Sequence, residues 1–385
     1  MPVSKKFKSL TAGELLPADV ATLEKELSDL WRAAAETPET EHPVVRASVL
    51  TLLAFVENEE DGRETFNLIS NVIAQNPCRA ILMVAEPGAH PEGLWAWISA
   101  QCHLPPSGAR QVCCEQIYLR ARGEAVKGLD NVVVPLIIPD LPVYFWWRAG
   151  RFAPPPFLDQ LLRVTNRVLV DSARFEEPEA DLATLARQVA RFRKVDGLAF
   201  SDLNWARLTP CRELIAQIFD SREACLCLPD LTEVSIEWQQ DAGREAERRA
   251  RALLLTAWLA SRLGWQPVTP ISPGADPDRV IEFRNGDKPV RIEWMAGHRG
   301  EKLPTAFRVF LKTGSKPPAM FEVVESEADK TVRTRTELPG LPPLERTARL
   351  LTMGEVELVN EELKFPGHDN IYEAALELIA AMVRL

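Results

Sequence analysis

Polar residues that directly follow apolar runs are the first places where this sequence could do chemistry. One such run ends at Val170 and is followed by Asp171 and Ser172. In open α/β sheets, ligands bind in the crevice beyond the carboxyl ends of the strands. Asp171 and Ser172 are therefore candidate ligand-binding residues. The alternative is that one of them caps the helix that follows, a common role for a short polar side chain.

A second run, Val143–Trp147, is preceded by Pro139-Asp140-Leu141-Pro142 and followed by Arg148. The prolines restrict the backbone, so Asp140 fits a turn and the five bulky residues fit a strand buried on both faces. Trp147 has two interpretations. It packs into the core, because aromatic side chains carry much apolar area. Or it is presented with Arg148 to a partner, because Trp and Arg dominate interface hot spots.

The segment from Asn204 to Phe219 predicts a helix with a well-marked start. Thr209 before Pro210 resembles an N-cap followed by proline in the first helical position, so the helix should begin at Thr209. Trp205 and Arg207 then lie in the loop that enters it. Loop aromatics and arginines beside a rigid element are candidate binding residues. The alternative is that they pack this loop onto the core.

Motifs of known catalytic and cofactor sites do not occur. The sequence contains no G-x-G-x-x-G, P-loop, G-x-S-x-G, H-E-x-x-H or EF-hand pattern, and its five histidines are scattered. The loop Lys312–Lys316 fits either an anion site or a hairpin turn kept polar by lysines. We therefore predict no catalytic residue, no cofactor and no metal site.

Seven cysteines are present, an odd number, and none forms a Cys-x-x-Cys pair. A disulfide framework is not expected in a large chain without a secretory signal. The sequence predicts free, buried thiols, because cysteine is among the residues most often buried.

Composition excludes several classes of protein. The 385 residues are 46% hydrophobic and 26% charged, which is typical of globular domains. A net charge of −10 argues against a nucleic-acid partner. No uncharged apolar run reaches the roughly 18 residues of a membrane span. The N-terminal residues lack the apolar region of a signal peptide, so we expect a cytoplasmic protein.

The first half of the chain predicts an α/β domain. Buried strands alternate with amphipathic helices, Glu64–Ala74 and Asp181–Phe192 among them, as in βαβ units that build a mixed, largely parallel sheet. The strands expected in one sheet are Val44–Val56, Arg79–Ala85, Val143–Trp147 and Arg167–Val170. We expect an N-terminal helix and linker over residues 1–39 and the α/β domain over 40–225.

The second half, residues 226–385, predicts an α+β domain with an antiparallel sheet and helices on one face. Thr232–Trp238 alternates apolar and polar residues, and Asn285-Gly286-Asp287 is a hairpin signal. The strongest helix is Ala242–Leu263. Its basic cluster, Arg244–Arg251, is interpreted as a solvated start supported by ion pairs four residues apart.

Several of these segments recur together, in this order, in the OpcA family of glucose-6-phosphate dehydrogenase assembly proteins. The chain resembles this family over about residues 40–385. One departure is Cys211, where the family more usually has a tryptophan. The segments that carry the resemblance are Pro139–Pro142 running into Trp146-Trp147, Val170–Ser172, Asp202–Pro210, Glu361–Leu363, and Asp369, Tyr372, Ala375 and Leu376.

The resemblance implies a non-enzymatic assembly factor and allosteric activator that binds glucose-6-phosphate dehydrogenase in the oxidative pentose phosphate pathway. The expected partner-binding residues are Asp140, Trp147, Arg148, Trp205 and Arg207. The alternative hypothesis is a sugar-phosphate-binding protein, or an enzyme without recognisable motifs, that uses the crevice near Asp140, Trp147, Asp171 and Ser172.

Overall fold

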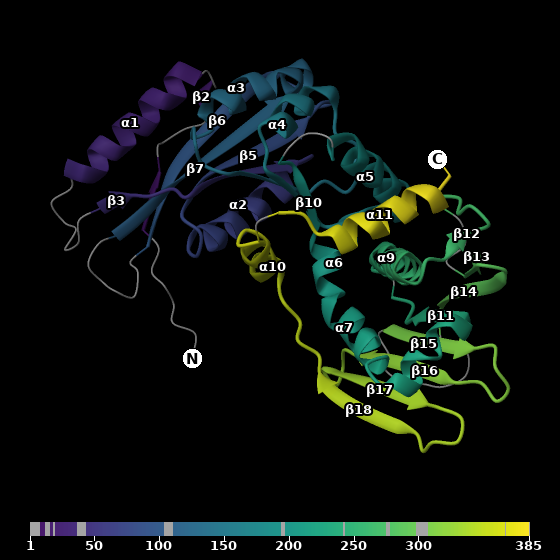
Figure 1. Cartoon of the computed structure of the whole chain (residues 1–385). Coiled ribbons are helices and arrows are strands. Elements are labelled where there is room, and N and C mark those ends of the chain that lie inside the picture. The colour runs from purple at the N-terminus through teal and green to yellow at the C-terminus, as the bar shows by residue number, and fades with distance from the viewer. Residues whose placement is uncertain are drawn as a thin grey trace.

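The computed structural model describes residues 8–11, 16–17, 20–36, 44–103, 111–193, 197–241, 243–274, 278–297, 307–365 and 367–384. These residues form two sheets, one of ten strands (sheet A) and one of eight (sheet B). Figure 1 shows that helices of the second half of the chain lie between the two sheets.

Sheet A has the strand order β1-β6-β7-β5-β4-β8-β9-β10, with β2 also on β6 and β3 also on β7. In this spatial order, neighbouring strands from β7 through β5, β4, β8 and β9 to β10 are parallel. By contrast, β1, β2 and β7 are antiparallel to β6. The prediction of a mixed, largely parallel sheet is confirmed. The strands are β1 (Lys8–Thr11), β2 (Leu16–Pro17), β3 (Val44–Arg46), β4 (Leu50–Val56), β5 (Cys78–Glu86), β6 (Gly93–His103), β7 (Gln111–Arg122), β8 (Val143–Trp147), β9 (Arg167–Val170) and β10 (Ala199–Asp202).

The predicted single strand Val44–Val56 is wrong in one respect, because it is two strands. β3 pairs with β7, whereas β4 pairs with β5 and β8. Between them the chain passes from one neighbour to the next: the N–H of Ala47 donates to Cys113 O, and that of Val49 to Pro77 O. A segment that is rich in strand-forming residues cannot by itself reveal such a change of partner.

The helices of the first half cover both faces of sheet A. Residues of α1 and α3 share one buried cluster with one face of the sheet, and residues of α2 share another with the opposite face. α2 begins five residues before the predicted start at Glu64, because Asn58 accepts the N–H of Asp61 and acidic residues favour the first turn. The helices are α1 (Val20–Glu36), α2 (Glu59–Ile73), α3 (Leu129–Leu136), α4 (Asp159–Arg163), α5 (Pro178–Phe192), α6 (Leu203–Arg207), α7 (Thr209–Ile218) and α8 (Arg222–Cys225).

The predicted loop before Thr209 is also wrong. Trp205 and Arg207 belong to the short helix α6, which follows the unpredicted strand β10. The side chain of Asp202 caps α6 by accepting the N–H of Asn204. α7 does begin at Thr209, so the predicted start position is confirmed, but Thr209 is not its N-cap: that position is Leu208, which makes no side-chain cap hydrogen bond, and a second helix precedes it directly.

Sheet B has the order β12-β13-β14-β11-β15-β16-β17-β18. All neighbours are antiparallel except β11 and β14, so the predicted antiparallel sheet is confirmed apart from this pair. Gly286, at φ 60, occupies the predicted hairpin turn. The elements are β11 (Leu231–Trp238), β12 (Gln266–Pro267), β13 (Arg279–Asn285), β14 (Lys288–Ala296), β15 (Phe307–Thr313), β16 (Met320–Ser326), β17 (Thr331–Glu337), β18 (Leu344–Arg349), α9 (Glu245–Leu263), α10 (Glu355–Glu362) and α11 (Asn370–Met382).

The basic start of α9 is not solvated as predicted. Arg248 is only 2% exposed and pairs with Glu327 at 2.8 Å. Arg251 pairs with Glu325 at 2.5 Å, and Arg249 pairs with the fully buried carboxylate of Glu179 on α5. These arginines pair with carboxylates of other elements. Because the partners are not three or four residues away on the same helix, the spacing of residues in the sequence does not reveal them.

Four cysteines differ from the prediction of free, buried thiols: Cys225 is exposed, Cys227 is half-buried, and the other two are bonded to each other. Cys102 and Cys113 form a disulfide, since the antiparallel register of β6 and β7 places them opposite each other. Cys78, Cys114 and Cys211 are free and buried, as predicted. The sequence separation alone did not indicate that the two strands would align in this register.

One hydrophobic core connects the two sheets. It contains apolar residues of sheet A, of sheet B and of the helices α5, α9 and α11. α11 packs against both α5 and α9, so the C-terminal helix returns to the first half of the chain (Figure 1). α11 thereby lies against the carboxyl edge of sheet A.

Candidate functional site

The carboxyl edge of sheet A gathers most of the side chains that the sequence predicts as functional. β8, β9 and β10 are parallel neighbours, so the residues after Trp147, Val170 and Asp202 meet at one edge. Arg148 and Asp171 follow two of these strands directly, and α6 follows the third.

Asp140 and Trp147 lie outside this polar edge. Asp140 precedes β8, so it occupies the opposite edge, exposed in a turn at φ 64. Trp147 is 2% exposed and stacks on Phe55 at 4.6 Å, with its indole N–H donating to Arg151 O at 2.9 Å. The core interpretation of this tryptophan matches its surroundings.

Arg148 is completely buried, and its guanidinium is fully engaged. It donates to both carboxylate oxygens of Glu355, at 2.8 and 3.0 Å, and to Glu64 at 3.1 Å. It also donates to the hydroxyl of Thr65 and lies over the ring of Trp146. Burial opposes its charge, but the hydrogen bonds and charge of Glu355 raise the pKa of Arg148 above its usual value. Arg148 thus binds α10 to sheet A.

Asp171 and Arg207 form a bidentate ion pair. The two guanidinium nitrogens of Arg207 donate to the two carboxylate oxygens of Asp171 at 2.6 and 2.9 Å. Asp171 also accepts the N–H of Ala173, which confirms the predicted cap at the start of the turn 172–174. Asp171 is 4% exposed, whereas the side chain of Arg207 is 29% exposed. Of this pair, only Arg207 presents appreciable surface.

Asp202 is a buried carboxylate that the sequence did not single out as functional. Its Oδ1 accepts the N–H groups of Ser172 and Asn204, both at 2.9 Å. The amide of Asn204 donates to the Ser172 hydroxyl, and Tyr372 lies 3.5 Å from the other carboxylate oxygen. Burial, together with the nearby charge of Asp171, raises the pKa of Asp202 to about 6.

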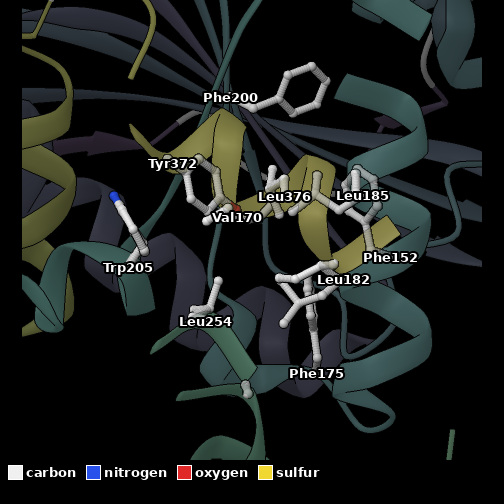
Figure 2. Close-up of a cluster of buried hydrophobic side chains, with 14 of the residues drawn as sticks. Phe152, Val170, Phe175, Leu182, Leu185, Phe200, Trp205, Leu254, Tyr372 and Leu376 are labelled. Atoms are coloured by element: carbon white, nitrogen blue, oxygen red, sulfur yellow. The ribbon is translucent and has the colours of Figure 1, made fainter. Parts of the chain in front are cut away.

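Trp205 joins α6 to the C-terminal helix. It is 4% exposed, and its indole N–H donates to Asp369 at 2.9 Å. Asp369 in turn caps α11, and Tyr372 of that helix packs against the indole ring (Figure 2). The guanidinium of Arg212 lies over the Trp205 ring, 3.6 Å from the ring centroid. Burial lowers the pKa of Arg212 to about 10.

Arg167 extends the same pattern and was missed by sequence analysis. It is 3% exposed at the start of β9, and it donates to Ser201 and to the carbonyl oxygens of Phe365 and Gly367. Its signal in the sequence is an arginine inside an otherwise apolar strand. Such a charge requires buried partners, and here the segment before α11 provides them.

These residues therefore form a joint between sheet A and the C-terminal helices. Arg148 holds α10, while Trp205 and Arg167 hold α11 and the segment before it. Among the residues that the structure describes, no group of three or more His, Cys, Asp or Glu could hold a metal ion. The polar groups at this edge contact one another, so the geometry favours positioning of α10 and α11 over binding of a small molecule.

An aromatic pocket of about 440 Å³ lies elsewhere, between α2 and the strands β6 and β7. Phe66, Trp97 and Tyr118 form its walls, and Arg63 and Arg120 lie at its rim. Sequence analysis did not predict this pocket. It did place Trp95 and Trp97, which are two residues apart, on the same face of one strand. Arg120 is paired with Glu59 and Glu86, so its charge is already balanced.

Comparison with protein families gives two matches that together cover most of the chain. Residues 70–187 match the family described as glucose-6-phosphate dehydrogenase subunit N-terminal domain. Residues 198–376 match the corresponding C-terminal domain. Both carry the family name OpcA.

Curated relatives agree with the family matches. A protein of Synechococcus elongatus, described as OxPP cycle protein OpcA, is 31% identical over 82% of this chain and 70% of its own length. A protein of Synechocystis with the same description is 28% identical over 84% of this chain and 67% of its own length.

Among solved structures, the chain matches the WlbA dehydrogenase of Thermus thermophilus. The match covers 86% of this chain and 94% of the other, with 13% identity and a TM-score of 0.39. Similarity at this level supports no statement about function. No helix in the described part of the chain combines the length and apolar character needed to cross a membrane.

Proposed function

The chain belongs to the OpcA family of glucose-6-phosphate dehydrogenase subunits, and we propose that it is a non-enzymatic activator that binds this dehydrogenase. The observation that carries the proposal is the match of both halves of the chain to the two domains of one family. The proposal includes an assembly role in the oxidative pentose phosphate pathway and a cytoplasmic location shared with the dehydrogenase.

The carboxyl edge of sheet A supports a binding role better than a catalytic one. Its charged side chains pair with one another and with the C-terminal helices. Of the five residues expected to bind the partner, Arg207 and Asp140 have accessible side chains. We propose Arg207 for direct contact, and we assign Trp147, Arg148 and Trp205 the indirect role of holding the surface around it in place.

The direct test is to mix the protein with the dehydrogenase of the same organism. Size-exclusion chromatography should show one complex, and the activity of the dehydrogenase should rise with the amount of the protein added. Calorimetry with glucose 6-phosphate distinguishes the alternative hypothesis. Tight binding of this sugar phosphate by the isolated protein, or turnover of it, would contradict the proposed function.

A further inference from the structure

An apolar groove lies at the far end of sheet B, between α7–α8 and the hairpin of β17 and β18. It has a volume of about 510 Å³. Its apolar lining includes Leu214 and Ile218 on the helix side, and Leu338, Leu341 and Leu344 on the hairpin side. Leu341 and Leu344 are 52% and 51% exposed, which is unusual for large apolar side chains that come together around a groove.

The groove borders an open strand edge. Among the described residues, β18 pairs only with β17, and all six of its residues are exposed. The N–H of Leu350, the residue after β18, donates to the carbonyl oxygen of Lys330, the residue before β17. Because backbone direction alternates along an antiparallel strand, the N–H and C=O groups of Glu345, Thr347 and Arg349 point away from β17. They are free to pair with an added strand.

The hairpin is basic although the chain as a whole is acidic. Residues 330–349 contain five basic and two acidic side chains, whereas the net charge of the chain is −10. Arg333, Arg346 and Arg349 are exposed, and no ion pair joins them to any residue that the structure describes. Arg346 lies on the groove side, and Arg333 and Arg349 lie on the opposite face of the hairpin.

We propose that β18 and the groove bind an extended segment of the partner protein. The segment would add a strand to sheet B at about 4.8 Å from β18. Its alternate side chains would be apolar, to enter the groove, and acidic, to meet Arg349 and Arg333. The inference rests on the proposed function, because the partner is the dehydrogenase, and it places the contact on sheet B rather than only at the edge of sheet A.

A proline at position 347 tests the strand addition. Thr347→Pro removes an outward N–H and no hydrogen bond to β17, so the edge strand should tolerate it. We expect the affinity for the dehydrogenase, measured by titration of its activity and by chromatography, to fall about tenfold or more. Thr347→Ala keeps the N–H and is the matched control, with the affinity of the wild type. Circular dichroism and thermal unfolding confirm that both variants are folded.

Charge reversal tests the second element of the recognition. Arg349→Glu should weaken the complex and reduce its sensitivity to salt, because an attractive charge pair is lost. The control is Arg284→Glu, an exposed arginine on β13 near the other edge of the same sheet. It should bind like the wild type.

The outcomes separate this inference from the proposed function. If the wild type forms no complex with the dehydrogenase, the proposed function fails, and the inference fails with it. If the wild type binds and Thr347→Pro binds equally well, only the docking site on β18 is wrong. If Thr347→Pro instead splits a homodimer seen in sedimentation and leaves dehydrogenase binding unchanged, β18 pairs with a second copy of this chain, and the inference is again overturned.

Discussion

At the scale of single residues, the carboxyl edge of sheet A is dominated by charges that lie in the interior. Asp202 is held there by two backbone N–H groups, which favour its ionised form, while burial and the charge of Asp171 oppose that form. The second effect is the larger, because the pKa rises from 3.8 to about 6. The ionised group therefore costs the folded state stability at neutral pH.

This shift predicts a specific pH dependence. The folded-state pKa of Asp202 is above the unfolded value, so its contribution to stability is highest below pH 3.8 and is lost as pH rises to about 6. Asn in its place could still accept both N–H groups but does not ionise. The free energy of unfolding of Asp202→Asn, minus that of the wild type, should grow by about 2 kcal/mol between pH 4 and 7. Urea denaturation at several pH values measures it. Asp140→Asn, at an exposed turn, should show no such growth.

Trp147 and Arg207 should differ in what their loss does. Trp147→Ala leaves a cavity in the core and should lower the free energy of unfolding by about 3–5 kcal/mol. Arg207→Ala removes a partly exposed ion pair and should cost only about 1–3 kcal/mol, but it should weaken dehydrogenase binding by the folded protein. Chemical denaturation and a binding titration on each variant separate the two effects. Unchanged binding by Arg207→Ala would remove it from the interface.

At the scale of elements, the sequence predicted strands that have either a buried apolar run or a regular alternation of apolar and polar residues. β4, β5, β8 and β9 are of the first kind and β11 is of the second, and both patterns are visible without knowledge of the neighbouring strands. β18 was missed because all of its residues are exposed and its sequence, Leu-Glu-Arg-Thr-Ala-Arg, shows no sustained apolar pattern. α6 was missed because it is only five residues long and its last residue lies two positions before the start of α7 at Thr209.

The joint at sheet A could be predicted only in part for a related reason. Asp171, Ser172, Trp205 and Arg207 were recognised because they follow or precede regular elements. Their partners are remote: Asp369 is 164 residues from Trp205, and Glu355 is 207 residues from Arg148. Such pairings depend on the topology of the whole chain, which no local spacing encodes.

The packing of α2 on sheet A gives a prediction at this scale. A Cβ at Gly62 would lie 2.8 Å from Val84 Cγ2 and 3.0 Å from the Tyr118 hydroxyl, so helix and sheet would have to separate. Gly62→Ala gains up to about 1 kcal/mol of helix propensity, but overpacking costs about 1–3 kcal/mol, so the net effect should be destabilising. Thermal unfolding measures it. At Gly88, where no atom lies within 4 Å of a new Cβ, the same substitution should have little effect.

At the scale of the whole molecule, the two halves predicted as separate domains share one interior. α5 belongs to the first half, α9 and α11 to the second, and the three helices pack against one another between the sheets. Figure 2 shows this shared core, in which Leu182 and Leu185 of α5 lie near Leu376 of α11 and Leu254 of α9. A core of this kind couples the stability of both sheets.

The coupling predicts one unfolding transition for the full chain. Glu179 of α5 is fully buried and pairs with Arg249 of α9 and, at 3.6 Å, with Arg279 of β13. Glu179→Ala leaves buried arginine without its carboxylate and should cost about 3–5 kcal/mol. Because the pair spans both halves, the loss should move the whole transition to lower temperature rather than split it. In calorimetry, the van't Hoff and calorimetric enthalpies should agree for the wild type and for this variant.

Glu64→Ala, whose side chain is 53% exposed, is the control and should shift the transition much less. Two resolved transitions in the wild type would mean that the halves unfold independently and that the shared helical layer is not what holds them together.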